Sequence, residues 1–235
     1  MVEIKNRMLK DYLENVLGKK IENISYEELK TIKNYPFKCC SEEHDGDFDV
    51  LKYLTDGDSV FVENYELSQK DIDELFRTDC KSLTFRRCLI GKGLTIPKNA
   101  ISEICFQGCL IEDYDSILTS NHSAKKIEFS NPYDEGEIDC NLIPESVETL
   151  VLNYCILNNC SHLGNKANCT SLFVLGTDLG ENLEFLQKMK NLKRVYLAER
   201  YLNDDNVKAI SEHCDVKTDF IDLLFEKEEV KAPAK

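Results

Sequence analysis

The sequence lacks several signals that mark membrane, catalytic and metal-binding proteins. Its 235 residues contain no run of 18 or more apolar residues, so no transmembrane helix is expected. There is no Gly-rich phosphate loop and no nucleophile elbow. None of the eleven cysteines has the C-x-x-C spacing that is typical of zinc sites. We therefore predict that the protein is not an enzyme and needs no cofactor.

The first twenty residues, MVEIKNRMLKDYLENVLGKK, also lack the apolar stretch of a secretory signal peptide, because charged residues interrupt the segment repeatedly. We therefore expect a cytoplasmic protein. In a reducing compartment, the eleven cysteines are expected to be mostly thiols.

Positive charge is scarce: the formal net charge is -14, which argues against nucleic acid as a direct ligand. Residues 42–74 carry twelve acids and only two lysines. This segment is either a solvated surface that keeps the protein soluble or a contact surface for a partner with a basic surface. The acids proposed for such a contact surface are Asp45, Asp47, Asp49, Asp56, Asp58 and Glu63.

Two short stretches partly resemble metal sites. The DGDFD stretch at 45–49 lacks the later Gly and Glu of an EF-hand, so we interpret it as an acidic loop. Cys155, Cys160, His162 and Cys169 suggest a zinc site, but the repeat described next places Cys155 and Cys169 at different heights inside the core. No metal site is predicted.

An eleven-residue pattern recurs along the chain. In VETLVLNYCIL, residues 147–157, apolar residues stand at offsets 0, 3, 5 and 10, and a cysteine stands at offset 8. Clear copies begin at residues 80, 101, 169 and 192, and weaker ones begin at residues 57 and 124. The fourth residues of the copies follow one another at steps of 21 to 23 residues and are Val60, Leu83, Ile104, Ile127, Leu150, Leu172 and Val195. Counting back from Val60 by the same step predicts a degenerate first strand at Phe37, and counting forward from Val195 reaches Val216, where the pattern fades.

This pattern resembles the leucine-rich repeat, LxxLxLxxN/CxL, over roughly residues 57–213. The resemblance implies an α/β solenoid: a horseshoe with a parallel sheet on its concave face and helical caps at both ends. It divides the chain into an N-terminal helical cap (1–35), the repeats (36–213) and a C-terminal capping helix with a tail (214–235). It also implies that the protein binds other proteins.

The cysteine position has a structural explanation in the family that the chain resembles. There, an Asn or Cys at this position points inward and bonds neighbouring backbone, and a small thiol with a weak donor suits such a site. We therefore predict structural thiols at Cys88, Cys109 and Cys155. We expect locally irregular turns where other residues replace the Asn or Cys, at Tyr65, Pro132, Thr177 and Arg200.

The ends of the chain show helical patterns. Apolar residues over 4–17 have helical spacing, and Gly18 is expected to end that helix. Ser25 and Glu28 have the spacing of a capping box for a second helix. Residues 218–230 predict a capping helix at the far end.

Alternation along the strands predicts which side chains face the concave surface. The last three strong copies place apolar side chains there: Val151, Phe173, Leu175 and Tyr196, with Tyr154 just beyond its strand. The earlier copies are more polar and contribute Phe61, Arg86 and an accessible Cys105. The apolar residues form either a partner-binding surface or a surface that the C-terminal cap covers.

Three functions remain open at this stage. The first is a non-catalytic scaffold, a monomer when free, that binds a partner protein on its concave face. The second is a small acidic inhibitor that occupies a basic groove of a nucleic-acid-handling enzyme. The third is a substrate receptor of a ubiquitin-ligase-type complex, which requires a helical recruitment site within residues 1–35.

Overall fold

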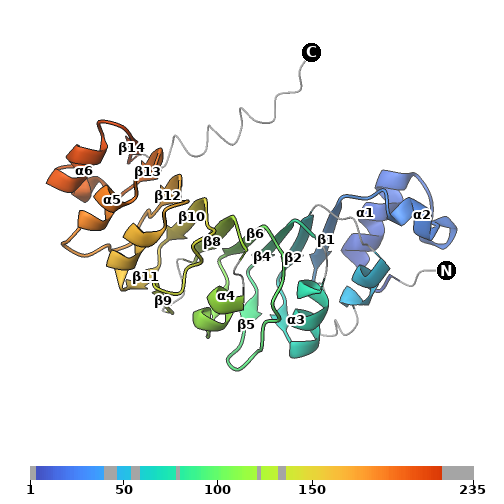
Figure 1. The fold of residues 1–235 in the computed structure, drawn as a ribbon. Helices are drawn as coiled ribbons and strands as arrows, with labels where there is room; N and C mark the ends of the chain where they lie inside the picture. The colour runs from blue at the N-terminus through green and yellow to red at the C-terminus, as the bar shows by residue number, and fades with distance from the viewer. Residues whose placement is uncertain are drawn as a thin grey trace, which may run out of the picture.

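A computed structural model of the chain describes residues 4–39, 47–53, 59–77, 80–120, 123–131 and 136–218. Its main feature is a nine-stranded sheet with the order β1-β2-β4-β6-β8-β10-β12-β13-β14 (Figure 1). All neighbours in this sheet pair in parallel. Each new strand is therefore added beside the previous one, and the fold is α/β, with one large parallel sheet and helices.

The strands of the large sheet are β1 (Asn34–Lys38), β2 (Ser59–Glu63), β4 (Ser82–Arg86), β6 (Glu103–Gln107), β8 (Lys126–Ser130), β10 (Thr149–Asn153), β12 (Ser171–Phe173), β13 (Arg194–Tyr196) and β14 (Asp215–Lys217). Short strands follow several of them: β3 (Glu66–Leu67), β5 (Leu89–Ile90) and β7 (Leu110–Ile111) form one small sheet, and β9 (Glu137–Asp139) pairs with β11 (Ile156–Asn158).

The pairing register confirms the predicted period. The seven anchor residues of the repeat, from Val60 to Val195, are Cα partners from one strand to the next. Val216 continues the row as the partner of Val195, although the sequence pattern fades there. At the other end Val60 pairs with Tyr35, whereas the predicted Phe37 pairs with Val62. The first strand thus exists, but its anchor lies two residues before the predicted one.

The α-helices are α1 (Arg7–Leu17), α2 (Tyr26–Leu29), α3 (Gln69–Phe76), α4 (Tyr114–Ser120), α5 (Glu184–Lys188) and α6 (Asp205–Ile210). Short 3-10 helices are η1 (Ile21–Asn23), η2 (Asp47–Tyr53), η3 (Cys160–Asn165) and η4 (Glu199–Tyr201). Helices α3 and α4 lie on the same side of the large sheet as β5 (Figure 1).

The core lies between the large sheet and these returning segments. The rings of Phe85, Phe106 and Phe129, on adjacent strands, stack with centroids 5.0 and 5.2 Å apart. Buried residues of α3 and α4, such as Leu75 and Leu118, join the same core cluster. Apolar burial of this kind contributes roughly 25 cal/mol per Å² and is the main favourable term in folding. We call the opposite side of the large sheet, formed by the residues that alternate with the core positions, the open face.

The N-terminal helices form as the sequence predicts. The Asn6 side chain accepts a hydrogen bond from the Leu9 N–H, and α1 ends at Gly18, whose φ is 64°. A left-handed φ of this kind suits glycine, which has no Cβ to clash. The predicted capping box of Ser25 and Glu28 is also present.

The far end differs from the prediction. Residues 215–217 form the last strand, β14, rather than part of a cap. Apart from Thr218, the predicted helix at 218–230 lies outside the described residues. The predicted boundary between residues 35 and 36 falls inside β1, because Tyr35 is already part of the sheet. Within the described ranges, no helix is long and apolar enough to cross a membrane.

Candidate functional site

The backbone turns in the same way directly after five strands of the large sheet. The residue four positions after the anchor has a positive φ in each case: 63° at Asn64, 52° at Arg87, 61° at Gly108, 57° at Tyr154 and 67° at Gly176. Glycine and asparagine tolerate this left-handed conformation, but for other residues it costs roughly 1–2 kcal/mol. Arg87 and Tyr154 therefore occupy positions that their side chains disfavour.

Tyr154 is held at this position by its neighbours. Its N–H donates to the Leu175 carbonyl over 2.8 Å, and the Leu175 N–H donates to Asn153 Oδ1 over 3.0 Å. Its ring lies against Gly176, where an added Cβ would stand 2.3 Å from Tyr154 Cδ1. Glycine at position 176 thus allows the close approach of the ring. The Tyr154 side chain remains 45% exposed.

A pocket of about 650 Å³ opens beside this tyrosine. Ile156 is the first residue of the short strand β11, is 47% exposed and also lines the pocket. We call this site the Tyr154 pocket; it is lined by Tyr154, Cys155, Ile156, Leu157, Cys160, Gly176, Asp178, Leu179 and Gly180. It presents two exposed apolar side chains at one hollow in the surface, an arrangement that favours binding of an apolar group.

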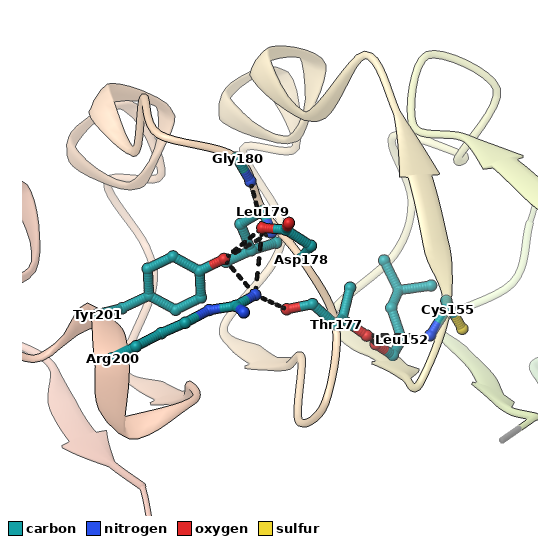
Figure 2. A network of polar contacts seen from close by, with 8 residues as sticks. All are labelled: Leu152, Cys155, Thr177, Asp178, Leu179, Gly180, Arg200 and Tyr201. Carbon is teal, nitrogen blue, oxygen red and sulfur yellow. Dashed lines mark hydrogen bonds and ion pairs between the residues drawn. The ribbon is translucent and has the colours of Figure 1, made fainter.

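Thr177 fixes the backbone next to the pocket-lining residue Cys155. Its hydroxyl donates to the Leu152 carbonyl over 2.5 Å and accepts the Cys155 N–H over 3.1 Å (Figure 2). Thr177 is fully buried at the cysteine position of its repeat. Its hydroxyl therefore satisfies two buried backbone groups, and each unsatisfied one would cost roughly 1–3 kcal/mol.

Asp178 forms one wall of the pocket. It accepts hydrogen bonds from the Gly180 N–H over 3.0 Å and the Tyr201 hydroxyl over 2.8 Å, and Arg200 Nη2 lies 3.1 Å away (Figure 2). These partners, the Gly180 N–H first, hold the pKa of Asp178 below its usual value. The Tyr201 hydroxyl also accepts the Leu179 N–H over 2.8 Å. The wall thus carries an ion pair of Asp178 and Arg200, and hydrogen bonds fix the position of the carboxylate.

The three predicted structural thiols lie where the repeat places them. Cys88, Cys109 and Cys155 are buried. The Cys155 thiol contacts the carbonyls of Phe129 and Asn153 at 3.5 and 3.4 Å, and the other two contact backbone carbonyls at 3.4 to 3.8 Å. Their inward, backbone-bonding placement is therefore confirmed.

The predicted apolar surface is more buried than expected. Phe173 and Tyr196 are Cα partners and their rings stack at 4.7 Å, as their equal offsets predict. The prediction that Tyr196 is exposed is wrong, because it is fully buried, with Phe173 on one side and Lys217 Nζ 5.8 Å from its ring centroid. Val151 and Leu175 are buried too, and Phe173 is half-buried. Strands about 4.8 Å apart bring neighbouring side chains close enough to cover one another.

Cys105 was also expected to be accessible, and this is wrong. It is buried between its partners Thr84 and Glu128 on the open face. Burial raises the pKa of its thiol to about 12, and the nearby Glu128 carboxylate acts in the same direction. Two other residues that were predicted to face the concave surface are more accessible than Cys105: Phe61 is half-buried and Arg86 is exposed.

Only part of the predicted acidic surface can be placed. Glu63 is 7% exposed and pairs with Lys38 at 3.3 Å and Arg87 at 3.8 Å, because cations flank it on the open face. It is therefore not a free acidic contact. Asp49 lies 3.7 Å from Lys70. The Asp47 side chain lies outside the described part of the structure, as do the residues Asp45, Asp56 and Asp58.

The charges of the open face nearly balance. Its described strands carry the cations Lys38, Arg86, Lys126, Arg194 and Lys217 and the anions Glu63, Glu103, Glu128 and Asp215. The excess negative charge of the chain therefore lies elsewhere. Among the described residues, no group of three or more His, Cys, Asp or Glu side chains is arranged to hold a metal ion.

The sequence pointed to Tyr154 but missed Ile156, Gly176 and the pocket between them. Ile156 occupies the same position in its repeat as Leu89 and Leu110, so an exposed aliphatic residue after the inward cysteine was a signal that could have been used. The pocket itself depends on how two repeats approach each other, which no local pattern encodes. No protein-family model matches the chain, and the comparison with curated proteins finds no match.

Proposed function

We propose that the protein is a non-catalytic protein-binding scaffold and that its partner places an apolar side chain in the Tyr154 pocket. The observation that carries this proposal is the position of Tyr154. A large aromatic side chain stands at a left-handed turn and remains 45% exposed. Backbone strain that the surrounding structure maintains is concentrated at binding and catalytic sites.

The chemistry of the pocket supports a protein partner. Exposed tyrosines are frequent anchors at protein interfaces, because the ring offers a large rigid contact area and a polar hydroxyl. Ile156 extends the apolar area, and Asp178, which is ion-paired with Arg200 at 3.1 Å, adds polar groups at its wall. The stacked rings of Phe173 and Tyr196 stiffen the adjoining part of the sheet.

The repeat supports the wider assignment. A 21–23-residue period, parallel strands in chain order and inward thiols that bond backbone all favour a leucine-rich-repeat solenoid with the open face on its concave side. Such proteins present a preformed surface, which reduces the entropy lost when a partner binds. We propose that the Tyr154 pocket lies at the edge of this surface.

Affinity capture from the source cell, followed by crosslinking and mass spectrometry, tests the proposal. Wild-type protein is compared with Tyr154→Asn and Ile156→Ser. Matched controls are Arg87→Asn, at the same left-handed turn, and Leu110→Ser, at the same position of another repeat and 49% exposed. A partner that crosslinks near the pocket and is lost only with the first two variants supports the proposal. Equal loss with the controls contradicts it.

The N-terminal helices support a second candidate, the substrate receptor of a larger complex. Met8 is 36% exposed and Val16 is 53% exposed on α1, while Leu9 and Leu13 are buried. Exposed apolar side chains of this kind could recruit another subunit. A Met8→Ser, Val16→Ser double variant that loses one partner but keeps the pocket's partner would support this role.

The acidic-inhibitor alternative has less support. Its candidate Glu63 is buried and paired, and the charges of the open face nearly balance. A partner affinity that falls steeply with added salt would favour it, because exposed charges are screened within about 8 Å at physiological ionic strength. A salt-independent affinity would favour the apolar pocket.

A further inference from the structure

We infer that Cys140 and Cys160 are a redox-responsive thiol pair, which a small-molecule disulfide such as oxidised glutathione converts into an intramolecular disulfide. The inference does not depend on the proposed partner binding, because it concerns a covalent change that can be observed in the isolated protein. It begins from the way two short strands bring these cysteines together.

Strands β9 and β11 place the two residues side by side. Asp139 and Asn158 are Cα partners, and the Cys140 N–H donates to the Asn158 carbonyl over 3.0 Å. Asn159 then turns the chain with a φ of 57°, and its side-chain amide donates to Asp139 Oδ1 over 3.0 Å. This turn directs Cys160 back toward Cys140, and the two thiols lie close enough for each to shift the pKa of the other.

The two thiols differ in their access to solvent. Cys140 is fully buried, whereas Cys160 is half-buried and lines the Tyr154 pocket. A small disulfide can therefore reach Cys160 through the pocket, whereas Cys140 does not line the pocket. An accessible thiol with a second thiol in reserve is the usual arrangement of redox-sensitive cysteines.

The neighbouring thiol favours reaction at Cys160 rather than at Cys140. The adjacent Cys140 thiol lowers the pKa of Cys160 despite the opposing effects of burial and of the Asp178 carboxylate, and a thiolate is the reactive form of cysteine. The Cys160 thiol and burial raise the pKa of Cys140, so Cys140 stays protonated while Cys160 reacts; Lys166, whose buried ammonium donates to the Ile143 carbonyl over 2.5 Å, lowers that pKa only in part. Asp139 opposes that effect, but its carboxylate is hydrogen-bonded to Asn159 and to the Asn141 N–H.

The proposed reaction has two steps. The Cys160 thiolate attacks one sulfur of oxidised glutathione, forms a mixed disulfide and releases one glutathione thiolate. The Cys140 sulfur then attacks Cys160 Sγ, breaks the mixed disulfide and releases the second glutathione. The two protein sulfurs are oxidised, one oxidised glutathione is reduced to two glutathione molecules, and these take up the two thiol protons.

The chain contains a matched control pair. Cys88 and Cys109 stand in adjacent repeats, and their thiols also lie close enough for each to shift the pKa of the other. Both are buried, and neither lines the Tyr154 pocket. If contact between thiols were sufficient, both pairs would oxidise equally. If access through the pocket decides, only Cys140 and Cys160 react.

The experiment uses the reduced full-length chain, oxidised glutathione and peptide mapping by mass spectrometry without reduction. Wild-type protein should yield a Cys140–Cys160 crosslink at least tenfold faster than a Cys88–Cys109 crosslink. Cys140→Ser should trap glutathione on Cys160, and Cys160→Ser should leave Cys140 unmodified. Circular dichroism verifies that each variant is folded.

Three results would overturn the inference. The first is glutathione that stays on Cys160 in the wild-type protein, which would show that Cys140 cannot resolve the mixed disulfide. The second is unmodified Cys160 in the folded protein. The third is equal oxidation of the control pair, which would show that the pocket has no influence. If a variant does not fold, the ratio of the two crosslinks in the wild-type protein still decides.

Discussion

The ring of Tyr154 lies so close to the backbone of Gly176 that a methyl group on Gly176 would stand 2.3 Å from Tyr154 Cδ1. Both residues have a positive φ, and both follow a strand of the large sheet at the same position of the repeat. The glycine thus satisfies its own turn and accommodates the aromatic ring of the preceding repeat. This contact places the exposed tyrosine beside the pocket.

Gly176→Ala should destabilise the protein more than Gly108→Ala. Both changes force alanine into a left-handed turn, at roughly 1–2 kcal/mol. At Gly108 the nearest atom to the new methyl group is 3.9 Å away, so that strain is the whole cost. At Gly176 the displaced Tyr154 ring should add about 1–3 kcal/mol, as overpacking usually does. Urea unfolding of both variants measures the difference.

A further variant assigns that difference to the ring. Adding Tyr154→Asn to Gly176→Ala should recover most of the extra cost, because the smaller side chain leaves room for the methyl group. Equal destabilisation by the two alanine variants would contradict the contact.

Thr177→Val should cost about 1–3 kcal/mol of unfolding free energy, because it leaves the buried Cys155 N–H and Leu152 carbonyl without their hydroxyl partner. Thr177→Ser keeps that hydroxyl and should lose only the smaller contribution of a methyl group, about 1 kcal/mol. Thermal melts of both variants test this order. If serine were as damaging as valine, packing rather than hydrogen bonding would explain the site.

Tyr196→Ala should destabilise the protein strongly, by about 3 kcal/mol or more, as truncation of a buried aromatic residue does. Phe173→Ala should cost less, because Phe173 is only half-buried. Differential scanning calorimetry of the two variants tests this, and a small effect at Tyr196 would show that its ring is accessible.

The Cys105 thiol should react slowly with a thiol reagent at pH 8, because it is buried and its pKa is raised to about 12. The pKa of this thiol is higher in the folded state than in the unfolded state, where it is near 9. Its contribution to stability is therefore complete below pH 9 and is lost as the pH rises toward 12. Cys105→Ser should therefore lose less stability than the wild type between pH 9 and 12. Rapid labelling of Cys105 at pH 8 would contradict its placement.

The sequence predicts the sheet register well, because each repeat carries its own alternation. Leu83, Leu150 and Val195 occupy equivalent positions in a continuous core, and that placement needs only a constant period. The same regularity placed the inward Cys155 correctly. At β1 the predicted anchor, Phe37, lies two residues after the observed one, Tyr35, because both aromatic residues suit the anchor position.

Burial on the open face was not predictable in this way. Alternation correctly separates Tyr196 and Cys105 from the core positions, but it contains no information about cover from adjacent strands. Phe173 and Lys217 beside Tyr196, and Glu128 beside Cys105, lie on adjacent strands about 4.8 Å apart and contribute to that cover. The Tyr154 pocket was missed for a related reason, since it depends on the approach of two repeats.

The most direct test of the proposed binding site compares Tyr154→Asn with Arg87→Asn. Asparagine tolerates the left-handed turn, so each variant should keep or slightly raise the unfolding free energy, by up to about 1 kcal/mol. Affinity for the captured partner, measured by calorimetry, should fall by about 2 kcal/mol or more for Tyr154→Asn, as for an interface anchor, and stay unchanged for Arg87→Asn. Unchanged affinity of a folded Tyr154→Asn variant would contradict the central claim.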